Sequence, residues 1–155
     1  MPGPAIGDKA PDFTLPRDGG ETVTLSALAP QKVVLYFYPR DDTPGCTTEA
    51  LDFTARIKEF AEAGAVVVGI SKDTVAKHDK FAAKHGLSVI LASDAEGDTC
   101  EAYGVWVEKN MYGKKSMGIA RTTFLIGADG TVAQVWPKVK VAGHADEVLA
   151  AVRAL

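Results

Sequence analysis

Residues 41–53 read DDTPGCTTEALDF and place one cysteine, Cys46, where a turn passes into a helical pattern. The thiolate, rather than the thiol, is the nucleophilic form of cysteine. A thiol in the first turn of a helix faces backbone N–H groups that lack intrahelical partners and the positive end of the helix dipole, and both favour the thiolate. The position therefore suits nucleophilic or redox chemistry. Most lone cysteines are instead small buried hydrophobic residues, and placement alone leaves both interpretations open.

The elements that must position Cys46 are predicted from apolar runs and turn residues. Residues 32–39 (KVVLYFYP) form a continuous apolar run, which predicts a buried strand ending at Pro39. A helix is expected from Cys46 to about Ala63, with Gly64 closing it. The cysteine then lies at the carboxyl end of a central strand, where open α/β sheets place their functional groups.

The rest of the chain alternates between strand and helix patterns. Residues 1–30 hold two short extended pieces around a turn. Further strands are predicted at 65–71 and 88–93, a hairpin at 121–137, and helices at 73–86, 94–104 and 144–155. This order predicts one α/β domain over residues 1–155, with a central mixed β-sheet flanked by helices and an N-terminal β extension. Such an arrangement is thioredoxin-like.

Composition excludes several classes of protein. The chain has 155 residues, of which 46% are hydrophobic and 24% charged, and its net charge is −3. The acidic balance argues against nucleic-acid binding, which needs basic residues to neutralise phosphates, and residues 109–115 (KNMYGKK) are expected to form a solvated loop. No apolar stretch approaches the roughly 20 residues that cross a bilayer, and no signal-peptide pattern is visible. We therefore expect a cytoplasmic protein without membrane segments.

Several segments together carry a family resemblance. They are FYPRDDTPGCTTE (37–49), GDKAPDFTLP (7–16), SDAEGDTCEAYGVW (93–106), KNMYGKK (109–115) and RTTFLIGADG (121–130). In this order the chain resembles the peroxiredoxins in their bacterioferritin-comigratory, or Q-type, form. The resemblance spans nearly the whole chain. It implies a thioredoxin-like fold and reduction of hydroperoxides by a cysteine thiol, with no metal ion and no organic cofactor.

The resemblance also assigns roles to single residues. Cys46 would be the peroxidatic cysteine, which attacks the O–O bond and becomes a sulfenic acid. Thr43 would orient the peroxide through its hydroxyl, and Arg121 would stabilise the thiolate and the charge that develops across the O–O bond. The alternatives are a turn-forming or capping threonine for Thr43 and a surface ion pair for Arg121.

Three further residues would support these groups. Pro39 would end the strand and wall the pocket, and Pro44 would shape the turn and shield the thiolate from water. Glu49 would hold Arg121 in place, and its alternative is a solvated glutamate on the helix surface. His78, His85 and His144 are expected to be exposed, and the first two lie too far apart along one helix for a paired metal site.

The chain departs from the family pattern at the step that reduces the sulfenic acid again. The two usual positions of a resolving cysteine hold Leu51 and Ala82. Either the protein is naturally of the one-cysteine kind, or Ala82 is an engineered replacement. Cys100 is expected to be a buried structural thiol. A resolving role would need its Cα atom within about 7 Å of that of Cys46, and hence local unwinding of the active-site helix.

An external thiol is then expected to reduce Cys46: thioredoxin, a glutaredoxin, glutathione or another small thiol. The resemblance further implies a monomer. A different function on the same fold is a redox-sensing or chaperone-like binding module, in which oxidation of Cys46 is a signal. A dithiol oxidoreductase is disfavoured because the chain has no CxxC pair, and nucleotide chemistry because it has no phosphate-binding loop.

Overall fold

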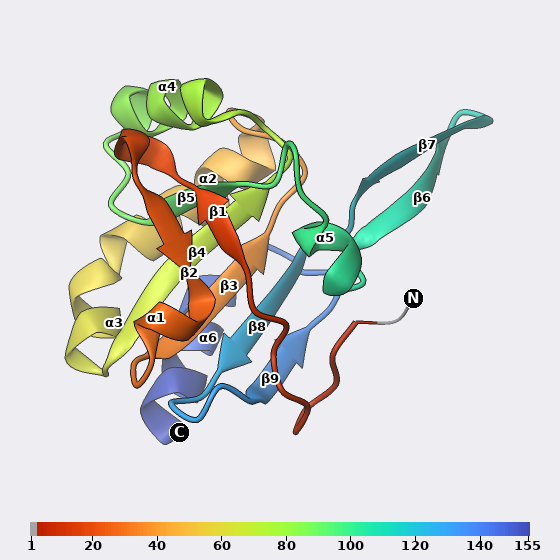
Figure 1. Cartoon of the computed structure of the whole chain (residues 1–155). Helices are drawn as coiled ribbons and strands as arrows, with labels where there is room; N and C mark the ends of the chain where they lie inside the picture. The colour runs from red at the N-terminus through yellow and green to blue at the C-terminus, as the bar shows by residue number, and fades with distance from the viewer. Residues whose placement is uncertain (1–2) are drawn as a thin grey trace.

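A five-stranded mixed sheet forms the centre of the computed structural model, which describes residues 3–155; Met1 and Pro2 of the predicted domain lie outside the described residues. The strand order is β5-β4-β3-β8-β9 (Figure 1). These strands are β3 (Lys32–Phe37), β4 (Ala65–Ser71), β5 (Ile90–Ser93), β8 (Thr122–Ile126) and β9 (Val132–Trp136). β3 and β5 run parallel to β4, whereas β8 is antiparallel to β3 and β9 to β8. The predicted mixed sheet is confirmed.

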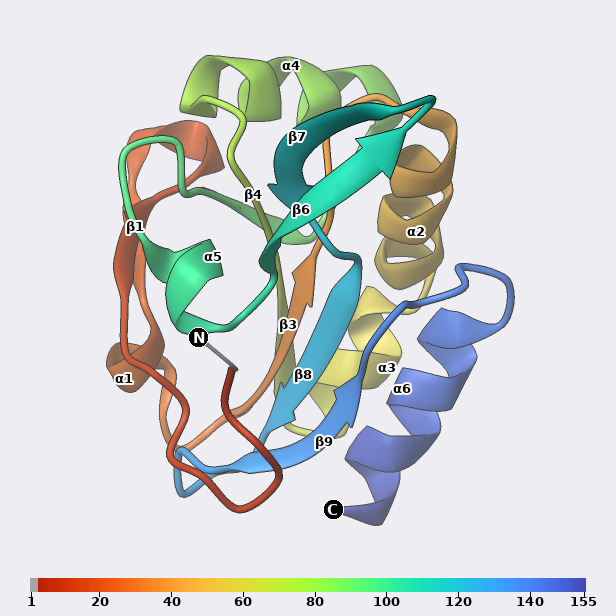
Figure 2. The same cartoon turned by 90° about the vertical axis from the view of Figure 1, so that its right-hand side faces the viewer.

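The two faces of the sheet carry separate hydrophobic cores, because successive side chains of a strand point to opposite faces. One core includes Leu35 and Phe37 of β3, and the other includes Val34 and Tyr36. Figure 2 shows β1, α1 and α5 on one side of the sheet and α2, α3 and α6 on the other. The first group comprises β1 (Thr14–Pro16), η1 (Asp18–Gly20), β2 (Thr22–Thr24), α1 (Leu25–Leu28) and α5 (Thr99–Ala102). The second comprises α2 (Pro44–Ala55), α3 (Ile57–Glu62), α4 (Val75–His85) and α6 (His144–Ala154).

The single helix predicted over 46–63 is wrong, because the segment forms two helices, α2 and α3, that meet at Arg56. The Arg56 guanidinium donates to the carbonyl of Asp52 at 2.8 Å, an oxygen that the Arg56 N–H would bond in a continuous helix. The Arg56 N–H bonds Phe53 instead, and the backbone leaves the helical region. The start is also earlier than predicted, because Pro44 suits the first position of a helix.

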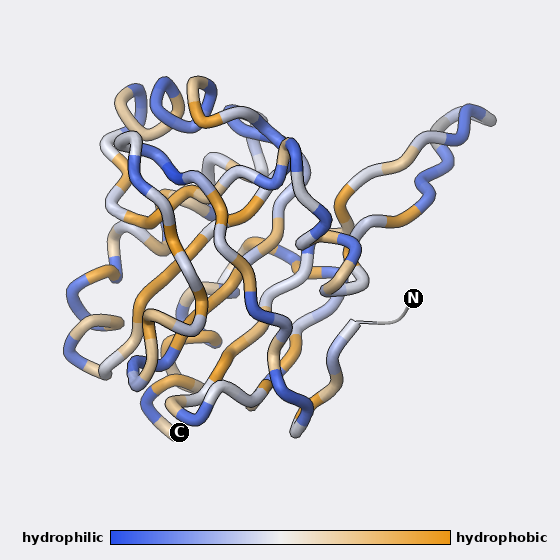
Figure 3. Tube along the Cα trace, viewed as in Figure 1, coloured by the Kyte–Doolittle hydropathy of each residue, from blue (hydrophilic) through white to orange (hydrophobic). Residues whose placement is uncertain are grey.

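The loop predicted over 109–115 is also wrong. The segment belongs to a hairpin of β6 (Trp106–Met111) and β7 (Lys114–Ile119), which projects from the body of the molecule (Figure 1). Tyr112 and Gly113 have φ values of 55° and 80°, as a two-residue turn of type I′ requires. The lysines at 114 and 115 are nevertheless exposed, and Figure 3 shows hydrophilic residues along much of the hairpin.

The prediction of three exposed histidines is wrong for two of them. His78 and His144 are 0% and 4% exposed, and His85 is half-buried. Both buried rings have partners, as buried polar groups usually do: His78 contacts Asp41, and His144 contacts the Thr123 hydroxyl at 2.8 Å. Helical periodicity could not reveal partners that lie far away in the sequence.

The strand predicted over 65–71 is observed with these bounds as β4, and the other predicted elements are observed with shorter bounds. The helix over 73–86 is α4, capped by the Thr74 hydroxyl, and the helix over 94–104 is limited to the four residues of α5. The carboxylate of Asp94 accepts from the N–H groups of Thr99 and Cys100 and so caps α5 from outside. Within residues 3–155, no helix is long and apolar enough to span a bilayer.

Candidate active site

Cys46 lies in the first turn of α2, which begins directly after the loop that leaves the carboxyl end of β3. The helix has 12 residues, so Cys46 faces unpaired N–H groups and a fully developed dipole. Its side chain is 1% exposed and belongs to the core between α2 and the sheet. The sulfur therefore lies inside the protein, directly below the start of α2.

Arg121 reaches the sulfur because β8 is antiparallel to β3. Thr122, the first residue of β8, pairs with Phe37, the last residue of β3, so Arg121 emerges at the edge where α2 begins. Its Nη2 donates to Cys46 Sγ at 3.2 Å, and its Nη1 donates to Glu49 Oε1 at 2.6 Å. One guanidinium thus holds a sulfur and a carboxylate, and it brings together three residues that the sequence singled out.

Burial changes the pKa values of the ionisable groups in this cluster. Glu49 is 1% exposed, and burial raises its pKa to about 7 even though Arg121 acts in the opposite direction. Its second oxygen, Oε2, is buried without a hydrogen-bond partner among the described residues. Burial acts to lower the pKa of Arg121, but the charges of Glu49 and Cys46 outweigh it and raise that pKa. The guanidinium is therefore a permanent cation beside the sulfur.

Two contributors to the site were missed by sequence reasoning. A Cβ atom at Gly45 would lie 3.3 Å from Arg121 Nη2, so a side chain there would push the guanidinium by a few tenths of an ångström from its place beside the helix start. Lys109 of β6 is half-buried, and burial together with repulsion from Arg121 lowers its pKa. The glycine beside Cys46 was a usable signal, whereas nothing in residues 109–115 indicated that Lys109 turns towards the site.

The remaining predicted site residues lie around this cluster. Thr43 is the N-cap of α2, and its hydroxyl donates to the carbonyl of Arg40 at 3.0 Å without capping the helix. Pro39 and Pro44 are exposed, and β3 already ends at Phe37, two residues before Pro39. The structure thus brings Cys46, Glu49 and Arg121 into contact, and the other three lie in the loop after β3 and at the start of α2.

Cys100 lies on the other face of the sheet. It is fully buried in the core that contains Phe37 and Tyr103, whereas Cys46 belongs to the opposite core. Burial and the nearby charge of Asp94 raise the pKa of Cys100 far above its usual value, which keeps it a thiol. The expectation of a buried Cys100 is confirmed, and β3 separates its core from that of Cys46.

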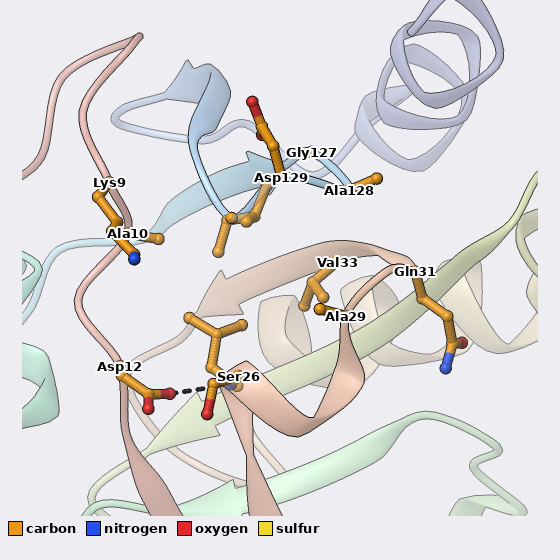
Figure 4. A pocket seen from close by; sticks show the side chains of 13 residues that line it. Lys9, Ala10, Asp12, Ser26, Ala29, Gln31, Val33, Gly127, Ala128 and Asp129 are labelled. Carbon is orange, nitrogen blue, oxygen red and sulfur yellow. Dashed lines mark hydrogen bonds between the residues drawn. The ribbon is translucent and has the colours of Figure 1, made fainter.

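Two cavities of the described residues lie away from the Cys46 cluster. One of about 320 Å³ lies at the other end of β3, between Val33 and the turn at Gly127–Gly130. Figure 4 shows its lining, with the Ser26 N–H donating to Asp12 at 2.9 Å. A second hollow of about 250 Å³ lies between the loop at 40–42 and α4. Neither of these two cavities is lined by a cysteine.

Comparison with known proteins agrees with this geometry. The family described as AhpC/TSA matches residues 6–135. The chain belongs to the AhpC/TSA family. Among named members, it is 54% identical over 143 residues to peroxiredoxin Bcp of Xanthomonas campestris, covering 92% of this chain and 89% of that protein. It is 51% identical over 144 residues to peroxiredoxin Bcp of Bacillus subtilis, covering 93% and 92%.

Solved structures of AhpC/TSA proteins have the same fold. Peroxiredoxin Q of Xanthomonas campestris superposes with a TM-score of 0.88 at 54% identity, covering 92% of this chain and 90% of that one. A cysteine-to-serine mutant of PrxQ from Xylella fastidiosa superposes with a TM-score of 0.94 at 41% identity, covering 99% and 98%. The thioredoxin-like fold is confirmed, and these relatives support a peroxidase, and thus an oxidoreductase, function that uses a peroxide and a thiol reductant.

The raised pKa of Glu49 predicts a pH-dependent stability. The folded chain holds this proton more tightly than the unfolded chain, so the contribution of Glu49 is present below pH 4.5 and is lost as the pH rises to about 7. Glu49→Gln removes the titration, so wild type should lose about 1–3 kcal/mol relative to the variant across this range. Urea unfolding from acid to neutral pH measures the difference. Glu62→Gln, on an exposed glutamate, is the control, and parallel curves for wild type and Glu49→Gln would contradict the prediction.

Proposed function

We propose that this chain reduces hydroperoxides with Cys46 as the peroxidatic nucleophile. The contact between Arg121 Nη2 and Cys46 Sγ, at 3.2 Å in the first turn of α2, is the observation that carries the proposal. The thiolate attacks one peroxide oxygen, an S–O bond forms as the O–O bond breaks, and the other oxygen leaves as alkoxide or hydroxide. The leaving oxygen takes a proton to become an alcohol or water, and Cys46 becomes a sulfenic acid.

Arg121 serves this reaction twice. Its guanidinium stabilises the thiolate before the attack and the negative charge that spreads over the O–O bond during it. Its position is fixed beforehand by Glu49, so little reorganisation is needed when the peroxide arrives. Thr43 would orient the peroxide by turning its hydroxyl from the Arg40 carbonyl, and Pro39 and Pro44 would shape the entrance.

The substrates are hydrogen peroxide and organic hydroperoxides. A solved structure of the Xanthomonas campestris bacterioferritin comigratory protein is described with an alkyl peroxide reduction activity, and it is 53% identical to this chain with a TM-score of 0.87. The same chemistry accepts either class, because the attacked O–O bond is common to both. The high identity over 92% of this chain supports an alkyl hydroperoxide as the first substrate to assay.

An external thiol completes the cycle. It attacks the sulfenic acid to give a mixed disulfide and water, and a second thiol then releases the Cys46 thiol and carries away the disulfide. Leu51 and Ala82 offer no sulfur, and Cys100 lies in the core on the opposite face of the sheet. Thioredoxin, a glutaredoxin or glutathione would supply the thiols to a cytoplasmic monomer. Cys100 would keep its structural role throughout.

The role of Arg121 is tested by replacing it. Arg121→Ala should lower the rate of Cys46 oxidation about 10²- to 10³-fold, since it removes the donor to sulfur and to the developing charge. The rate is measured by mass spectrometry after mixing with a hydroperoxide. Arg121→Ala also leaves Glu49 buried without a partner, so the double variant with Glu49→Gln controls for lost stability. A wild-type rate in the folded double variant would remove Arg121 from the mechanism.

Steady turnover distinguishes the enzyme from a redox-sensing module. Such a module is the alternative because Leu51 and Ala82 occupy the two usual positions of a resolving cysteine. With excess hydroperoxide and glutathione or dithiothreitol, the wild-type chain should consume many equivalents of peroxide per Cys46. Cys46→Ser should consume none, and Cys100→Ser should retain at least about half of the rate because its thiol is buried away from the site. Consumption that stops after one equivalent would favour the sensor.

A further inference from the structure

A second cluster of buried polar side chains lies behind the loop that precedes Cys46. Asp41 is in the middle of this loop, and its side chain is only 5% exposed. One carboxylate oxygen accepts from the Tyr38 hydroxyl at 2.6 Å, and the other lies 2.6 Å from Nδ1 of His78 on α4. The Asp41 N–H donates to Asp73 at 2.8 Å. The loop is therefore fixed from β3, from α4 and from the segment after β4.

The neighbouring residue strengthens the same connection. Asp42 has a φ of 60°, a left-handed conformation that non-glycine residues rarely adopt. Its carboxylate contacts Lys84 Nζ at 2.7 Å and His85 Nε2 at 2.8 Å, both on α4. The exposed fraction of the Asp42 side chain is 43%, so these contacts are weaker than those of the buried Asp41. The principal link from the loop to α4 is therefore the pair of Asp41 and His78.

The contacts of the His78 ring place a hydrogen-bond acceptor beside each of its two nitrogens. His78 Nε2 lies 3.0 Å from the carbonyl oxygen of Ala92, which can only accept, so Nε2 carries a proton. A neutral imidazole would then direct the lone pair of Nδ1 at a carboxylate oxygen 2.6 Å away. The contact is favourable only if a second proton lies between Nδ1 and Asp41, as in an imidazolium paired with a carboxylate.

The surroundings favour such a retained proton. The His78 side chain is 0% exposed. The charged and titratable groups around the cluster come from four segments: Arg40, Asp41 and Asp42 from the loop, Tyr38 directly after β3, Asp73 from the segment after β4, and Lys77, Lys80, Lys84 and His85 from α4 itself. The Asp41 carboxylate contacts the imidazole directly, and the Asp73 carboxylate accepts from the Asp41 N–H. Cationic side chains line the hollow beside the loop: Arg40, Lys77, Lys80 and Lys84. A buried cation between Asp41 and Ala92 satisfies both acceptors.

We infer that His78 is a positioning residue of the active site, and that the proton it shares with Asp41 holds the loop at 40–43 in the geometry that Cys46 chemistry needs. The loop carries Thr43 and leads directly into the first turn of α2. Arg121, directly before β8, contacts the sulfur, and His78 of α4 holds the backbone that precedes it. The inference rests on the proposed peroxidatic role of Cys46, because positioning matters only if the sulfur reacts there.

Two substitutions at His78 separate its two hydrogen bonds. The amide nitrogen of asparagine can take the place of Nδ1 and still donate to Asp41, whereas that of glutamine takes the place of Nε2 and donates only to Ala92. Both variants are neutral and both remove ring atoms from the same core, so thermal unfolding of each reports the shared structural cost. Tyr38→Phe removes a second donor to Asp41 while leaving the ring packing intact.

The rate constant for sulfenic acid formation on Cys46, measured in a single turnover with hydroperoxide, is the test. His78→Gln should lower it about tenfold or more, and His78→Asn should stay within about threefold of wild type, because only the former releases the loop. Tyr38→Phe should lower it less than His78→Gln. Equal rates in both His78 variants would overturn the inference. An unreactive wild-type Cys46 would instead contradict the proposed function itself.

The shared proton is tested without any loss of fold. In ¹⁵N-detected NMR of the wild-type chain at neutral pH, both His78 nitrogens should show attached protons, whereas an exposed histidine is then mostly neutral. Asp41→Asn should lose the Nδ1 proton, because an asparagine amide can donate to a neutral imidazole in the same position. A wild-type His78 with one protonated nitrogen would overturn the assignment of the shared proton. His85, half-buried on the same helix, provides an internal reference.

Discussion

The guanidinium of Arg121 is the contact on which the rest of the site depends. It donates to a buried sulfur and to a buried carboxylate at the same time, and neither would be tolerated as an anion in this core without it. Because Glu49 is almost fully buried, its charge costs stability that Arg121 only partly returns. This desolvation cost falls near the start of α2, where backbone N–H groups also favour an anion.

The architecture places these groups by simple geometry. β3 and β8 are antiparallel neighbours, so the end of one strand and the start of the other meet at the same edge of the sheet. The loop to α2 follows the end of β3, and Arg121 directly precedes the start of β8. Arg121 and Cys46, which are 75 positions apart in the sequence, therefore come into contact. Alternation along β3 then divides the two thiols between opposite cores. Cys46 lies beside the guanidinium of Arg121, and Cys100 lies on the opposite face beside the carboxylate of Asp94.

Much of this arrangement could be predicted from the sequence because its signals are local. The apolar run of β3, the turn before Cys46 and the helix that follows are local patterns, and the family resemblance supplied the roles of Glu49 and of the distant Arg121. Partners that depend on tertiary structure could not be predicted in this way. The burial of His78, the break at Arg56 and the approach of Lys109 to the site each depend on a contact that no periodicity records. The hairpin was missed because tyrosine, rather than asparagine, precedes Gly113 in its turn.

The most direct test of the account follows the oxidation of both thiols. The reduced chain is treated with one equivalent of hydroperoxide in the presence of a sulfenic-acid trap, and mass spectrometry locates the adduct. The account predicts an adduct on Cys46 with Cys100 still a free thiol, since only the former lies beside Arg121. A Cys46–Cys100 disulfide would contradict the separation of the two thiols by the sheet, and an unmodified Cys46 would contradict its role as the nucleophile.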